Sequence, residues 1–181
     1  MEDFFIFLSA FLILSPLLIF INRGFYLIIS IFLILLLIST RNFGPDYKTY
    51  YDFFNNPITS VDALFSGSIE PFWPPYMYSI KNLFDKPSVG FTLIGLISFL
   101  ARYLSSRLLF KSNALLSLSL SVYIFNDFFN RDLGQIRNGL SSSLLGLAIS
   151  YYIVNQKNNF YITSLFSILT HYQSIVLLGL L

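Results

Sequence analysis

The sequence predicts an all-α fold, a polytopic membrane helix bundle with about six transmembrane helices. Three observations support this prediction. Apolar runs of about twenty residues recur along the chain, and a bilayer-spanning helix needs about that many apolar residues. Charged residues make up 11% of the sequence, whereas soluble domains carry about 25%. The mean hydropathy is +0.69, which also indicates an integral membrane protein.

The first two apolar runs, residues 4–21 and 25–40, predict a helical hairpin with a tight turn at residues 22–24. Pro16 is expected to kink the first helix, because proline removes a backbone donor and clashes with the preceding turn. Two acidic residues precede the first run, and a basic N-terminal region is lacking. The run therefore predicts a retained helix rather than a signal peptide.

Residues 41–87 are too polar to cross lipid and too aromatic for a simple linker, so they predict an extracytoplasmic loop against the membrane surface. The second half of the loop combines prolines with Phe, Trp and Tyr side chains, and Trp and Tyr favour the headgroup region. A short interfacial or re-entrant helix that starts near Glu70 fits this composition. Irregular backbone at membrane depth is tolerated where protein or water covers it.

Four more apolar runs predict helices over residues 89–109, 114–129, 133–154 and 160–181. Near the end of the first of these helices, Arg102 and Arg107 are expected to extend their charged ends to the membrane surface. The last run reaches the final residue without a polar stop. The expectation is therefore a single membrane domain over residues 1–181 that forms the N-terminal part of a longer protein.

Alternation of six spans places polar residues from separate segments on one side of the membrane. His171 lies in the half of the last helix nearer to that side. The opposite side carries a basic cluster at the end of the third helix, and the positive-inside rule predicts that it is cytoplasmic, although six of the eleven Lys and Arg residues fall on the shared side. The shared side is therefore extracytoplasmic, and its residues include Arg41, Asp46, Glu70, Asp132, Gln135 and Arg137.

Arg137 opens one of the most apolar segments, where a guanidinium costs about 2.5–3.5 kcal/mol on membrane-insertion scales. Polar packing between helices accounts for the glycine and serines of this segment. It accounts for Arg137 only if Asp127 or Asp132 pairs with it. The other interpretation is an anionic ligand or an aqueous cavity, which the wide polar sector favours. That sector comprises Arg131, Gln135, Asn138 and Ser142 on one helix face, with Arg137 and Ser141 on a neighbouring stripe.

A second polar stripe follows the last predicted helix and includes the single histidine of the sequence. A histidine there can simply hydrogen-bond a neighbouring helix, but ionisable groups within membrane segments are functional candidates by default. A neutral imidazole near pH 7 can act as a general base or donate to a phosphate. The stripe consists of Thr163, Ser167, Thr170, His171 and Ser174.

Two carboxylates of the loop have both an ordinary and a functional interpretation. Asp46 follows a Gly-Pro pair that is typical of turns, but the nearby Tyr47 and Tyr50 would help it accept a proton or bind sugar hydroxyls. Glu70 suits a first helical turn, where acidic residues complement the helix dipole. A carboxylate beside Trp73 is also an arrangement found in sugar sites, because aromatic faces pack on the C–H surfaces of sugar rings.

Composition excludes several chemistries. The sequence has no cysteine and one histidine, so disulfides, thiolate metal sites and histidine metal clusters are excluded, and neither a metal nor a cofactor is expected. Phosphate-binding glycine loops, the G-x-S-x-G elbow and the HExxH motif are absent from the sequence. No basic run indicates nucleic acid as a partner.

Four short blocks follow one another along the chain. They read Arg41-x-x-Gly44-x-Asp46-Tyr47-x-x-Tyr50, Ile69-Glu70-Pro71-Phe72, Ile136-Arg137-Asn138-Gly139-Leu140-Ser141 and His171-Tyr172-Gln173-Ser174. In order, spacing and membrane context they resemble the EpsG family of bacterial polysaccharide polymerases, which is related to the Wzy O-antigen polymerases. Each block is weak by itself, and four in sequence are fairly specific. Pro45 stands where the family commonly has a smaller residue, and family members are typically much longer, with several further spans.

The resemblance implies polymerisation of undecaprenyl-diphosphate-linked oligosaccharide repeat units into a surface polysaccharide, such as O-antigen, capsule or exopolysaccharide. The enzyme would be a metal-independent, multi-pass glycosyltransferase of the bacterial cytoplasmic (inner) membrane, with its active face extracytoplasmic. Its partners would be the lipid-linked oligosaccharide, the lipid bilayer, and other polysaccharide export or chain-length proteins.

The implied reaction, in which a sugar hydroxyl attacks an anomeric carbon and polyprenyl diphosphate leaves, suggests roles for the candidate residues. Arg137 is expected to stabilise the leaving diphosphate, because positioned charge acts most strongly where charge develops. His171 is the first choice of base, with Asp46 or Glu70 next, and these four are the predicted catalytic residues. The predicted substrate-binding residues are Arg41, Tyr47, Tyr50, Trp73, Arg131, Gln135 and Ser174.

Two other functions stay open at the level of sequence. A transporter or flippase of a lipid-linked or anionic substrate would use Arg137, Asp132 and His171 as a substrate or proton pathway. Short, interrupted helices repeated in both halves would favour it, and the sequence shows no such internal repeat. A non-catalytic assembly subunit or an inactive truncated fragment is the third alternative.

Overall fold

The computed structural model describes residues 2–39, 47–55, 70–84, 86–132 and 135–179. Every regular element in these ranges is helical. The prediction of an all-α fold is therefore confirmed.

The N-terminal hairpin agrees with the sequence prediction. It consists of α1 (Glu2–Leu14), the 3₁₀ segment η1 (Ser15–Phe20) and α2 (Arg23–Ser39). The 3₁₀ segment begins at Ser15 and has Pro16 in its first turn, so the first helix is irregular at the position where the kink is predicted. In the turn, Asn22 Oδ1 accepts hydrogen bonds from the backbone N–H groups of Gly24 at 2.7 Å and Phe25 at 3.2 Å. These bonds satisfy donors that the start of α2 would otherwise leave free.

Two helices lie in the segment predicted as a surface loop, namely α3 (Tyr47–Asn55) and α5 (Trp73–Phe84). The backbone N–H of Trp73 donates to the carbonyl oxygen of Glu70 at 3.2 Å, so the helix predicted to start near Glu70 is present. Lys81 of α5 donates to the carbonyl oxygen of Asn55 at 2.8 Å and thereby joins the two helices. The position of this segment relative to a membrane stays a prediction.

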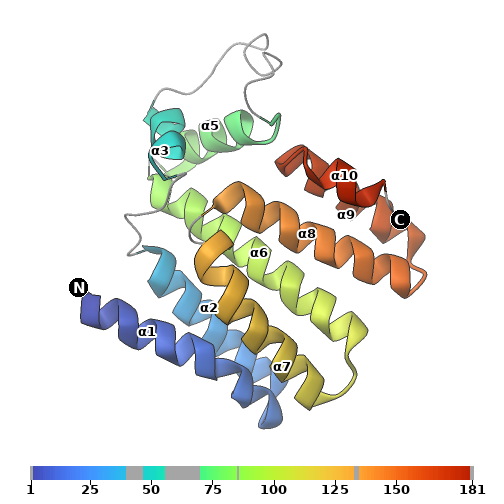
Figure 1. Ribbon diagram of the computed structural model, residues 1–181. Coiled ribbons are helices and arrows are strands. Elements are labelled where there is room, and N and C mark those ends of the chain that lie inside the picture. Colours follow the sequence, from blue (N-terminus) through green and yellow to red (C-terminus); the bar gives the residue numbers. More distant parts are fainter. Residues whose placement is uncertain (1, 40–46, 56–69, 85, 133–134, 180–181) are drawn as a thin grey trace.

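The remaining elements form the body of the bundle. They are α6 (Pro87–Leu109), α7 (Asn113–Tyr123), the π-helical segment η2 (Ile124–Asp132), α8 (Ile136–Ile153), α9 (Lys157–Thr170) and α10 (Ser174–Leu178). Helix α6 packs against both α2 and α8, and α8 also packs against α9. Figure 1 shows α3 and α5 together at the end of the bundle where α6 and α8 begin.

Two of the predicted helices are not continuous α-helices, so these two predictions are wrong. The helix predicted over residues 114–129 changes to π geometry at Ile124. The helix predicted over residues 160–181 ends at Thr170, and His171 has an extended backbone with φ −163° and ψ 116°. Apolar length predicts neither interruption, because groups outside the helix must satisfy the backbone atoms that a break releases.

One helix in the described ranges, α6, is both long and apolar enough to cross a bilayer. Shorter apolar helices cover Ile6–Phe20 and Arg23–Leu37. Large apolar side chains are exposed along α1, α2 and α9, which is the surface expected of helices in lipid. The described helices therefore agree with a membrane protein, while the number of spans stays a prediction.

Candidate active site

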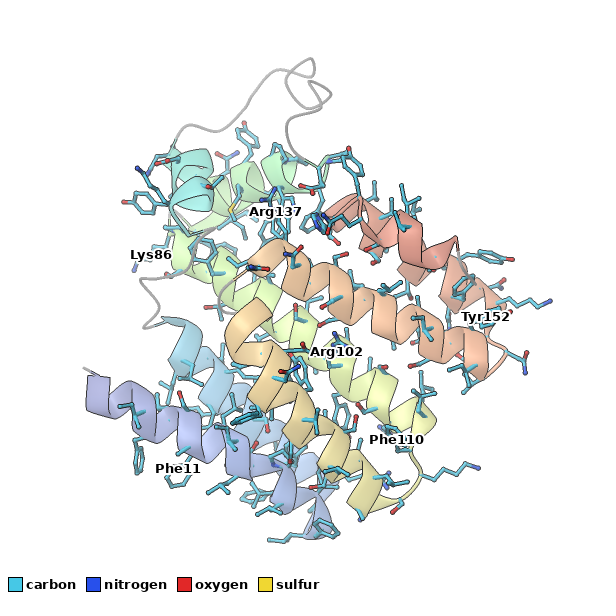
Figure 2. All side chains as sticks on the ribbon, viewed as in Figure 1. Phe11, Lys86, Arg102, Phe110, Arg137 and Tyr152 are labelled. Atoms are coloured by element: carbon cyan, nitrogen blue, oxygen red, sulfur yellow. The ribbon has the colours of Figure 1, made fainter. Side chains whose placement is uncertain are left out.

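Glu70 lies between two residues that come from separate helical segments. Nη1 of Arg137 donates to Oε2 of Glu70 at 3.3 Å, and Nδ1 of His171 lies 2.6 Å from Oε1. Figure 2 shows Arg137 at the end of α8 that is nearer to α5. The Glu70 side chain is 8% exposed, whereas that of Arg137 retains 31%. Three of the four predicted catalytic residues therefore meet at one carboxylate.

The first turn of α8 determines the place of Arg137. The backbone N–H of Gly139 donates to the carbonyl oxygen of Gln135 at 2.9 Å, and Asn138 Nδ2 donates to Gln135 Oε1 at 2.7 Å. These bonds define the start of the helix, from which Arg137 reaches Glu70. The sequence suggests Asp127 and Asp132 as partners of Arg137, whereas the contact with Glu70 is seen only in the tertiary structure.

The interruption after α9 determines the place of His171. Trp73 Nε1 donates to the carbonyl oxygen of Thr170 at 2.9 Å, and Thr170 Oγ1 donates to the carbonyl oxygen of Ser167 at 2.8 Å. A side chain of α5 thus satisfies a carbonyl at the end of α9. Because Glu70 and Trp73 are about one helical turn apart, the beginning of α5 holds both Thr170 and His171.

A buried cluster of serines joins the three C-terminal helices. Ser167 Oγ donates to the carbonyl oxygen of Ser141 at 2.9 Å and to Ser174 Oγ at 3.0 Å. The hydroxyls of Ser141 and Ser174 also hydrogen-bond each other. These bonds connect α8, α9 and α10, as expected of small polar residues that let helices approach closely. The packing interpretation therefore holds for these serines.

The protonation of the Glu70 carboxyl follows from its surroundings. Burial raises the pKa of Glu70, but the hydrogen bonds from His171 and from a backbone N–H, together with the charge of Arg137, lower it by more. The resulting pKa lies below the usual value, so Glu70 is ionised at neutral pH and can only accept. The shared proton therefore belongs to Nδ1 of His171, and Nε2 of a neutral imidazole carries a lone pair.

A cavity of about 250 Å³ lies beside His171. Six of its eight described lining residues carry an amide or hydroxyl group, so it offers polar partners to a ligand that carries hydroxyls. Two predicted substrate-binding residues, Gln135 and Ser174, contribute to it. The described lining consists of Gln135, Asn138, Ser141, Ser142, Leu145, His171, Gln173 and Ser174.

Trp73 was predicted to contact substrate, and the structure corrects this role. The side chain is fully buried, and its ring packs against Phe72 and Tyr76 at centroid distances of 5.0 and 6.2 Å. No face of the indole is therefore exposed for a sugar ring to stack on. Trp73 instead supports the site through its hydrogen bond to Thr170.

Other predicted residues fall elsewhere in the chain. Arg131 lies in η2 rather than on α8, so the predicted face shared with Gln135 does not exist as a single helix. Its side chain, and those of Tyr47 and Tyr50 in α3, lie outside the part of the chain that the structure describes. Arg41 and Asp46 also lie outside the described residues.

Arg102 was expected at the membrane surface and instead lies among the helices. Its Nε donates to Ser143 Oγ at 3.2 Å and its Nη2 to Ser142 Oγ at 3.1 Å. Nη2 also lies 3.8 Å from Asp127 of η2, and the guanidinium carbon lies 5.5 Å from the centre of the Tyr123 ring. The adjacent serines on α8 were a signal of this contact, because arginine on an apolar helix needs polar partners. Figure 2 shows Arg102 away from Arg137, within the helix bundle.

The fold and the site together define a class: a helical membrane-associated protein that holds an Arg–Glu–His group beside a polar cavity. The model of the EpsG family matches residues 24–181, and the chain belongs to this family. The resemblance inferred from the four sequence blocks is confirmed. Membership connects the chain with polysaccharide biosynthesis at a membrane. Neither a curated protein nor a solved structure matches the chain.

Proposed function

We propose that this chain carries active-site residues of a polysaccharide polymerase that joins undecaprenyl-diphosphate-linked oligosaccharide repeat units. The observation that carries the proposal is the Glu70 carboxylate, which contacts Arg137 and His171 beside a cavity lined by amides and hydroxyls. This arrangement supplies a cation for a diphosphate, a base for a hydroxyl, and polar groups for a sugar. Family membership supports the same reaction.

The reaction transfers a glycosyl group between two lipid-linked sugars. The acceptor hydroxyl loses its proton to Nε2 of His171, and its oxygen forms a bond to the anomeric carbon of the donor. The bond from that carbon to the diphosphate oxygen breaks, and the electron pair leaves with polyprenyl diphosphate. The active face is extracytoplasmic in this proposal.

Glu70 acts in this reaction as the partner of His171 rather than as the base itself. Its lowered pKa keeps the carboxylate charged, and its bond to Nδ1 selects the tautomer with a free Nε2. When His171 takes up the acceptor proton, the adjacent carboxylate stabilises the imidazolium. This is the role of the acidic residue in the Ser-His-Asp triad.

Arg137 stabilises the leaving diphosphate. A guanidinium is the side chain that pairs best with phosphate oxygens, because its planar fork can donate to two of them at once. Its partial exposure agrees with this use. Because negative charge grows on the diphosphate as the bond breaks, the arginine acts most strongly in the transition state.

The test is complementation of a polymerase-null strain with the full reading frame. Arg137→Ala should reduce polymer formation by about 10²–10³-fold, the loss that follows removal of a positioned donor. Arg137→Lys should also be impaired, because lysine keeps the charge but loses the planar fork. The exposed Arg107 provides a matched control, and Arg107→Ala should leave chain length unchanged. Normal chain length in Arg137→Ala, at normal protein level, would contradict the proposal.

Transport of a lipid-linked substrate is the second candidate, and one observation favours it. The last helix is interrupted at residues 171–173, and interrupted helices form binding sites in many transporters. Proteoliposomes that contain labelled lipid-linked repeat unit separate the two functions. A polymerase lengthens the glycan, whereas a flippase exposes it on the opposite leaflet without changing its length.

A further inference from the structure

The cavity beside His171 differs in chemistry from the ion pair next to it. Its described lining contains three amides and three serine hydroxyls, with the imidazole as a titratable group. Arg137 and Glu70 are not among these lining residues. None of the described lining residues carries a fixed positive charge, so a diphosphate bound there would lose hydration without gaining a cation from them, which is unfavourable.

We propose that this cavity binds the sugar ring that carries the attacking hydroxyl, and that this ring is uncharged. The inference rests on the polymerase function proposed above and assigns a ligand to one part of that site. In this proposal Arg137 binds the diphosphate of the donor, outside the cavity. Acceptor and donor are thereby recognised by different side chains of the same site.

The hydrogen-bonding capacity of the lining suits a sugar. The bond from Asn138 to Gln135 uses one donor and one acceptor, and each amide retains further donors and acceptors. Gln173 adds an exposed amide from the interruption between α9 and α10. Each sugar hydroxyl both donates and accepts, so it can pair with the donors and acceptors of these amides.

The position and size of the cavity agree with an acceptor sugar. His171 uses Nδ1 on Glu70, so Nε2 is the ring nitrogen that remains for a ligand. A ring held beside His171 brings one hydroxyl to the base that must deprotonate it. The volume of about 250 Å³ is below the roughly 300–1,000 Å³ of sites for drug-sized ligands. The cavity therefore accommodates one sugar ring rather than a whole oligosaccharide.

The experiment measures the KM of the acceptor and the KM of the donor separately. Purified full-length protein in proteoliposomes receives the lipid-linked repeat unit as donor and the same oligosaccharide as its methyl glycoside. The glycoside lacks a diphosphate and can act only as acceptor. Glycosyl transfer to it yields one KM for the glycoside and another for the donor.

Asn138→Asp and Gln173→Glu each replace a lining amide by a carboxylate of nearly the same shape. Both variants should raise the glycoside KM by about five- to tenfold, because each loses a donor that the sugar uses. The donor KM and kcat should stay within about twofold. Asn158→Asp makes the same change on an exposed residue at the start of α9 and should alter neither KM. Arg137→Lys should show the opposite pattern, with a raised donor KM and an unchanged glycoside KM.

A change in the charge of the acceptor sugar provides an independent test of the proposal. Oxidation of the acceptor's terminal sugar to a uronate should raise the glycoside KM by about tenfold or more in the wild-type protein, since the described lining residues offer no fixed counter-charge. Thermal melting of each variant checks that folding is intact.

Two results would overturn the assignment: an unchanged glycoside KM in both amide variants, or a rise confined to the donor KM. Failure of the polymerase function itself looks different, because the wild-type protein would then form no product with either substrate. The two failures are therefore distinguishable in the same assay.

Discussion

The Arg102–Asp127 region and the Glu70–Arg137–His171 region both hold an arginine near a carboxylate, but they do so in different surroundings. Among the helices, Arg102 is held by two serine hydroxyls and a tyrosine ring, and the carboxylate of Asp127 is 3.8 Å away. At the start of α8, the carboxylate is the more buried partner and also accepts from an imidazole.

The difference between the two regions supports the role proposed for Arg137. Both guanidinium groups are held by polar contacts. The contacts of Arg102 join α6 to α8 and η2, which stabilises the bundle. The contacts of Arg137 include a carboxylate that also controls the tautomer of His171. Both arginines lie near a carboxylate and a cavity, so the imidazole that contacts the Glu70 carboxylate is the feature that supports the proposed active site.

The largest expected effect comes from neutralising the carboxylate of each region. Glu70→Gln keeps the shape but removes the charge that holds Nδ1–H of His171, so polymer formation should fall on the order of 10³–10⁴-fold. Asp127→Asn makes the same change beside Arg102 and should reduce the rate by less than about tenfold, because it touches no reacting group in our proposal. Initial rates of polymer formation in proteoliposomes measure the effects of both substitutions. Equal losses in the two variants would refute the distinction between the regions.

Removal of Arg102 should affect stability rather than chemistry. Arg102→Met loses the bonds to Ser142 and Ser143 and leaves Asp127 without this cation, so the free energy of unfolding should fall by about 1–3 kcal/mol. Arg107→Met, an exposed position on the same helix, should change it by less than about 0.5 kcal/mol. Denaturant unfolding in detergent micelles provides the measurement. A wild-type unfolding free energy with a large loss of turnover would assign Arg102 to the active site instead.

The smallest effect concerns acid stability and belongs to the Glu70 region. The pKa of Glu70 is lower in the folded than in the unfolded protein, where it is about 4.3. Its contribution to stability is therefore complete above about pH 4.3 and decreases as the pH falls through the folded pKa. Glu70→Gln should flatten the melting temperature profile below about pH 4.3. An unaltered profile in Glu70→Gln would show that this carboxyl is not preferentially ionised in the folded state.

Features that depend on near neighbours in the chain could be predicted from the sequence. The helical class follows from apolar length, and the irregularity at Pro16 follows from its missing N–H. The helix after Glu70 follows from local composition. The family followed from four short blocks, because residue identity and order need no coordinates.

Features that depend on distant partners could not be predicted from the sequence. Arg137, His171 and Glu70 were each candidates, but their convergence joins positions up to 101 residues apart. Trp73 has the composition of a sugar contact, and only packing shows that it is buried against the end of α9. Arg102 was misplaced for the same reason, since the serines that receive it are 40 and 41 residues away.

The sequence by itself determined that this chain forms apolar helices, that it belongs to the EpsG family, and that an arginine, a glutamate and a histidine are candidates for catalysis. Tertiary structure decided that Glu70 is the shared partner of the other two and that the last helix is interrupted at His171. It also decided that amide and hydroxyl side chains, together with the His171 imidazole, are among the described lining of the adjacent cavity. Apolar length and local donors act within a few residues, whereas hydrogen bonds between helices depend on which surfaces pack together.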